Sequence, residues 1–82
     1  MIEKIAKIVE KIILPKYPEI IDVIVEIKFI DGDVYIVNYS LNEELSNVRK
    51  IDLIGDTRTL LKMISVDKAV VDFEIRPPRM KN

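Results

Sequence analysis

The stretch IIDVIVEIKFIDGDVYIVNYS, residues 20–40, decides the fold. Two runs rich in β-branched and aromatic residues, 20–30 and 34–40, flank Asp31-Gly32, the pair that a type I′ turn requires. The stretch therefore predicts a β-hairpin.

A two-residue loop at Asp31-Gly32 fixes which residues face each other in this hairpin. The predicted pairs are Phe29–Val34, Ile27–Ile36 and Val25–Asn38. Side chains alternate between the two faces of a strand. The predicted core face carries Val23, Val25, Ile27, Phe29, Val34 and Ile36. The other face carries Asp22, Ile24, Glu26, Lys28, Ile30, Tyr35, Val37 and Tyr39, which is too apolar for an ordinary solvent face.

Working outward toward the N-terminus, residues 2–14 have the pattern of an amphipathic helix. Ile5, Ile8, Val9 and Ile12 recur at helical spacing, and charged residues occupy the other side. Pro15 disfavours helical geometry at the residue before it, so the helix should end there.

Residues 41–55 fit two patterns. Ser40-Leu41-Asn42-Glu43 is typical of a capping box, which favours a helical turn. Residues 48–54, between Asn47 and Gly55, also fit a third strand, and we favour a turn followed by that strand. Asp56 is then the expected N-cap of a helix over 57–65.

Toward the C-terminus, residues 69–75 alternate, with Val71, Phe73 and Ile75 on one face, until Pro77-Pro78 ends the strand. The sequence predicts a single α+β domain over residues 1–76 and a flexible tail over 77–82. We expect a two-layer sandwich: a mainly antiparallel sheet of three or four strands with two helices, in the order α-β-β-(β)-α-β.

The composition narrows the possible functions. The 82-residue chain has no cysteine for disulfides, and no histidine, the commonest zinc ligand and general base. We therefore expect no metal, no cofactor, no catalytic residue and no enzyme activity.

A net charge of −1 gives no overall attraction to nucleic acid or anionic membranes. The apolar runs are short, which predicts a cytoplasmic protein with no membrane contact, and the bias toward Ile, Val, Lys and Glu resembles that of hyperthermophile proteins.

One motif suggests metal chemistry. Asp22 followed by Glu26-Ile27-Lys28 superficially resembles the signature of the restriction-endonuclease-like nucleases, which implies a divalent ion held by the carboxylates. In that family the aspartate comes from a preceding strand, whereas Asp22 and Glu26 lie on one strand, about 13 Å apart at ~3.3 Å per residue. Alternating charges that keep a sheet face soluble explain the motif better.

Nucleic-acid binding is an alternative function. Its candidate contacts are the basic residues Arg49, Lys50, Arg76, Arg79 and Lys81, with Arg58 and Lys62 nearby in the sequence. Exposed tyrosines on a strand can also stack on bases. Interleaved aspartates and a pI near 5.4 weigh against this function.

The sequence supports self-association more strongly than it supports nucleic-acid binding. Five residues of the second hairpin face form the predicted interface: Ile24, Ile30, Tyr35, Val37 and Tyr39. Such a face exceeds what a monomer normally exposes to water, so a second copy is expected to cover it in a homodimer. Alternatively, one helix covers each face within a single chain. The leading hypothesis is a small homo-oligomeric interaction or assembly module.

Overall fold

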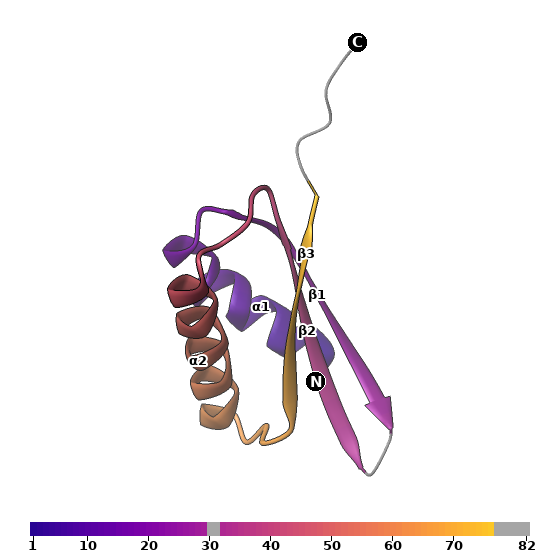
Figure 1. The fold of residues 1–82 in the computed structure, drawn as a ribbon. Helices are drawn as coiled ribbons and strands as arrows, with labels where there is room; N and C mark the ends of the chain where they lie inside the picture. Colours follow the sequence, from indigo (N-terminus) through magenta and orange to yellow (C-terminus); the bar gives the residue numbers. More distant parts are fainter. Residues whose placement is uncertain (30–31, 77–82) are drawn as a thin grey trace.

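The computed structural model describes residues 1–29 and 32–76, and it has the expected α+β class (Figure 1). Two helices accompany a three-stranded sheet, whose strand order is β1-β2-β3. The predicted tail 77–82, with Arg79 and Lys81, lies outside the described residues, as do Ile30 and Asp31.

The first helix, α1, spans Ile2–Ile12 and confirms the predicted amphipathic helix. Ile5 and Val9 on its inner side are fully buried, while its lysines are exposed. A short 3-10 helix, η1, follows at Leu14–Lys16 and has Pro15 in its first turn. Proline is tolerated there because the first turn of a helix needs no backbone N–H from it.

The hairpin is confirmed, but its predicted register is wrong by one residue. Strands β1 (Ile20–Phe29) and β2 (Asp33–Leu41) are antiparallel, and Phe29 pairs with Asp33 instead of Val34. Three residues therefore separate the paired ends, and Gly32 has a φ of 99°, which glycine adopts without a Cβ clash. Because faces alternate along a strand, this slip turns every β2 side chain to the face opposite the predicted one.

The predicted strand over 48–54 is also wrong. Helix α2 runs from Asn47 to Met63 and takes in that whole segment. Its N-cap is Ser46, whose Oγ accepts a hydrogen bond of 3.3 Å from the N–H of Arg49. Asp56 lies inside the helix and does not cap it. The helix predicted over 57–65 therefore exists, but it begins ten residues earlier than expected.

Strand β3 (Ala69–Ile75) confirms the last predicted strand. Val71 and Phe73 are half-buried, whereas Asp72 and Glu74 on the opposite face are exposed. It runs parallel to β2 because α2 carries the chain back between the two strands. The sheet is therefore mixed, with β2 in the centre.

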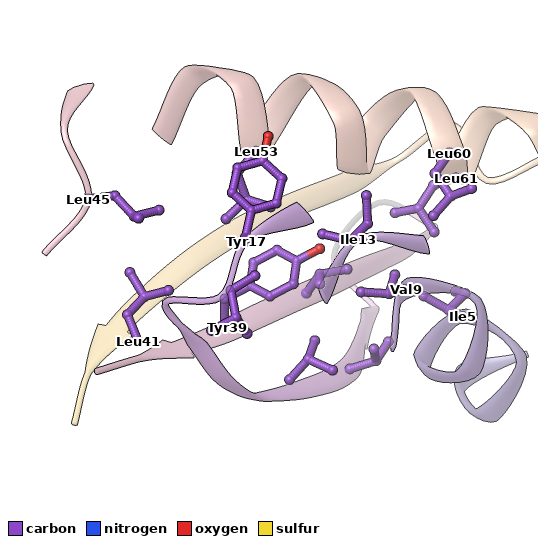
Figure 2. Close-up of a cluster of buried hydrophobic side chains, with 14 of the residues drawn as sticks. Ile5, Val9, Ile13, Tyr17, Tyr39, Leu41, Leu45, Leu53, Leu60 and Leu61 are labelled. Carbon is purple, nitrogen blue, oxygen red and sulfur yellow. The ribbon is translucent and has the colours of Figure 1, made fainter. Parts of the chain in front are cut away.

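Both helices pack on one face of the sheet and share a single core with it (Figures 1 and 2). Tyr39 of the central strand lies within this core, and its ring stacks on Phe73 of β3 with centroids 6.4 Å apart. The core contains Ile5, Val9, Ile13, Tyr17, Ile20, Val23, Val25, Val37, Tyr39, Leu41, Leu45, Leu53, Leu60, Leu61 and Val66. Both described helices thus lie on the same face, not one on each, and within residues 1–29 and 32–76 no helix lies over the second face of the sheet.

Candidate interaction surface

We call the face that carries no helix the open sheet face. Its members alternate in sequence with the core residues of each strand. They are Asp22, Ile24, Glu26 and Lys28 of β1, Val34, Ile36, Asn38 and Ser40 of β2, and Val70, Asp72 and Glu74 of β3.

Apolar side chains lie in the middle of the open sheet face. Ile24 is 46% exposed and Val70 is 41% exposed, while Ile36 is half-buried between its neighbours. The half-buried Val34 lies nearer one end of the face, beside Lys28. The register places Ile36 between Glu26 of β1 and Val70 of β3. The face is therefore an apolar centre with charged side chains around it.

The predicted interface is only partly brought together. Ile24 lies on the open sheet face as expected, but Val37 and Tyr39 are fully buried in the core beneath the helices. Tyr35 is half-buried against the same core, and Ile30 lies outside the described residues. The one-residue register slip explains this result, since it exchanges Tyr35, Val37 and Tyr39 for Val34, Ile36 and Asn38 on the open face.

Arg76 organises the charges at one end of the open sheet face. Its guanidinium Nη2 donates hydrogen bonds to Ser40 Oγ at 2.8 Å and to Asp22 Oδ2 at 3.4 Å. Its Nε also lies 4.0 Å from Oε1 of Glu74. These contacts cover Ser40, which is only 1% exposed. Asp22 and Glu74 nevertheless leave this end of the face acidic.

The residues predicted to contact nucleic acid do not form one patch in the described part of the chain. Arg49 and Lys50 lie on α2, on the helix side of the sheet, whereas Arg76 binds Ser40 on the opposite side. Each forms an ion pair: Arg49 with Glu19 at 2.8 Å, Lys50 with Glu44 at 3.2 Å, and Arg76 with Asp22.

The outer side of α2 is a second apolar surface, which the sequence analysis did not identify. Val48, Ile51 and Met63 are 69%, 68% and 78% exposed. Gly55 lies between them at the middle of the helix, and a Cβ added there would meet nothing within 4 Å. The β-branched residues of the segment 48–54 favour a strand, so the sequence pattern does not place Val48 and Ile51 on a helix surface.

A polar cluster fastens the η1 connection to α2. The hydroxyl of Tyr17 donates a hydrogen bond of 2.8 Å to Asp56 Oδ2, and burial and this bond raise the pKa of Tyr17 to about 12. Arg49 donates two hydrogen bonds of 2.8 Å to Glu19, which lower the pKa of Glu19, and its Cζ lies 5.0 Å from the centre of the Tyr17 ring. These contacts give Asp56 and Arg49 a structural role: they hold α2 against the segment that contains Tyr17 and Glu19. No sequence spacing predicts contacts between residues this far apart.

A second polar contact lies inside the core. Thr57 Oγ1 donates its only proton to the carbonyl oxygen of Leu53 at 2.7 Å, so the hydroxyl of Tyr39, 2.8 Å away, donates to Thr57. Burial raises the pKa of Tyr39 to about 12. Figure 2 shows Tyr39 within the cluster of buried side chains. The bond to Thr57 lets this tyrosine occupy the core without an unpaired hydroxyl.

Within residues 1–29 and 32–76, no three His, Cys, Asp or Glu side chains gather closely enough to hold a metal ion. The first helix adds no third carboxylate to the nuclease-like motif, because its Glu10 lies on α1, across the sheet from Asp22 and Glu26. No helix in the same ranges is long and apolar enough to cross a membrane.

An open depression on the outside of α1 is lined by Glu3, Lys4, Lys7, Ile8 and Lys11.

Comparison with known proteins identifies the fold. No family model matches the chain, and no curated protein matches its sequence. Among solved structures, the chain is similar to the MamB CTD, a magnetosome protein of Desulfamplus magnetovallimortis BW-1, with a TM-score of 0.63 and 19% sequence identity. The match covers 99% of this chain and 96% of that one. The two therefore share a fold over their whole length.

Proposed function

We propose that this chain is a homo-oligomeric protein-interaction module whose open sheet face makes the contact between two copies. The observation that carries the proposal is the position of the helices. Both pack on the core face, which leaves Ile24, Ile36 and Val70 together on a face that no part of the described chain covers. A second copy removes that apolar surface from water.

The size of the domain supports the same proposal. A chain of 82 residues buries a smaller share of its surface than a larger domain does, so its stability benefits from area buried between copies. The MamB neighbour is named as a CTD, which makes it one part of a larger protein. This fold similarity supports a role as a module and does not indicate which surface is used.

Nucleic-acid binding has less support. The three described basic residues that were candidates for it are divided between two sides of the sheet, and each pairs with a carboxylate. Phosphate contacts need a cluster of cations on one surface.

The mass of the chain in solution, measured by light scattering across a range of micromolar concentrations, tests the proposed function. We expect twice the 9.5 kDa of a single chain. Replacing Ile24→Lys and Val70→Lys together should raise the dissociation constant at least tenfold, or about 1.4 kcal/mol, because each copy would bury two charges in an apolar centre.

Val48→Lys together with Ile51→Lys is the matched control, because it places the same two charges at apolar positions of α2 that are more exposed than Ile24. It should leave the dimer unchanged. A native chain that stays monomeric at high micromolar concentration contradicts the proposed function.

A further inference from the structure

The sheet register divides the open sheet face into four parallel rows. The first row holds Asp22, Ser40 and Glu74, the second Ile24, Asn38 and Asp72, the third Glu26, Ile36 and Val70, and the fourth Lys28 and Val34. The exposed apolar side chains, Ile24 and Val70, and the half-buried Ile36 lie in the two inner rows. The two outer rows carry charges of opposite sign.

The face is therefore electrically polarised along the strands. Three carboxylates, Asp22, Asp72 and Glu74, lie in the first two rows, and Arg76 offsets one of them. At the other end, the fourth row carries Lys28. Lys68 lies at the same end, immediately before β3, with its Nζ near Gly32, and Glu26 in the third row is the one carboxylate among the described residues in that half of the open sheet face.

Two copies can stack their open sheet faces about a twofold axis in two ways. An axis along the strands places rows of the same number over each other, so that acidic rows meet acidic rows and basic rows meet basic rows. An axis across the strands reverses the row order, so that the first row of one copy lies over the fourth row of the other. The second arrangement places opposite charges together at both ends.

We infer that two copies dock through their open sheet faces with their strands antiparallel, which places Lys28 of each copy over Asp22 of the other. This inference rests on the proposed function, because it specifies how the self-association occurs. Ile24, Ile36 and Val70 then lie in the middle of the contact, and the ion pairs lie at its rim. Such a contact is isologous, since each patch is complementary to itself.

A charge exchange tests the docking arrangement by sedimentation of the full chain at low salt. Lys28→Glu alone and Asp22→Lys alone should each raise the dimer dissociation constant about tenfold, because each replaces two symmetry-related attractions with repulsions. The double variant, Lys28→Glu with Asp22→Lys, should restore the native constant to within about threefold. The losses should shrink in 0.5 M NaCl, where screening is strong.

The outcomes separate the two proposals. Rescue in the double variant supports antiparallel docking. A dimer that neither single variant weakens, or that the double variant fails to restore, overturns the docking while the proposed function stands. A native chain that is monomeric overturns both. Lys28 and Asp22 are exposed, so these variants should remain folded, which circular dichroism checks.

Discussion

Tyr39 shows how one residue reports the register of the whole sheet. In the predicted register its ring faces solvent or a partner, whereas in the structure it is fully buried and its hydroxyl bonds to Thr57 of α2. Tyr17 has a similar arrangement at the edge of the core, bonded to Asp56 of the same helix. Two buried tyrosines therefore connect α2 to the rest of the chain through their hydroxyl groups.

Because of these two tyrosines, we expect the folded chain to be less stable at alkaline pH. The pKa values of Tyr17 and Tyr39 are raised to about 12, above the ordinary value of 10. A raised pKa means that the contribution to stability is complete below pH 10 and is lost as the pH rises through 12. The free energy of unfolding should fall by roughly 1.4 kcal/mol per pH unit for each tyrosine across that range, as measured by urea unfolding.

Tyr39→Phe separates one tyrosine from the other. At neutral pH it should cost about 1 kcal/mol, because one buried hydrogen bond is lost while Thr57 still donates to Leu53. Between pH 10 and 12 it should roughly halve the loss of stability. An unchanged pH dependence in this variant would show that the Tyr39 hydroxyl ionises in the folded chain at its ordinary pKa, which would contradict the raised value.

At the scale of elements, the sequence predicts α1, both hairpin strands and β3, because each has a clear hydrophobic period and a clear stop signal. The hairpin register was not predictable from the same pattern. Strand β2 has apolar or aromatic residues on both faces, Val34 and Ile36 on one and Val37 and Tyr39 on the other, so alternation did not select a core face. The loop length decides the register, and Asp31-Gly32 suits loops of more than one length.

The first half of α2 was not predicted, for a related reason. Its first half contains the β-branched residues Val48, Ile51 and Ile54, and Gly55 follows them, which favours a strand and a stop. Burial of Leu53, Leu60 and Leu61 against the sheet outweighs these local preferences. The open sheet face also depends on where α2 packs, so its members could not be identified from sequence alone.

Gly55 provides a prediction about α2. Glycine inside a helix costs stability relative to alanine, and a Cβ at this position meets nothing within 4 Å beyond its chain neighbours and the backbone of its own helix. Gly55→Ala should therefore raise the free energy of unfolding by about 0.5 to 1 kcal/mol, seen as a thermal midpoint several degrees higher. Its dimer dissociation constant should stay unchanged, because α2 lies on the side away from the proposed contact. A weaker dimer would place the contact on α2.

At the scale of the whole molecule, the described part of the chain is a two-layer α/β arrangement with helices on one face of the sheet only. One sheet face is covered by two helices and holds the core, while the other has an apolar centre and charges of opposite sign at its two ends. Two such faces stacked together form a sandwich in which both sheets are covered on each side. The proposed self-association would complete the architecture that the described part of a single copy leaves open.

Because the chain contains no cysteine, single introduced thiols report directly on which surfaces meet. The decisive measurement compares crosslinking of Ile24→Cys with that of Gly55→Cys by a short bismaleimide. The first thiol lies near the proposed twofold axis, and the second lies on the outer side of α2. We predict a covalent dimer from Ile24→Cys and little from Gly55→Cys. Efficient crosslinking through Gly55→Cys, with none through Ile24→Cys, would contradict association through the open sheet face.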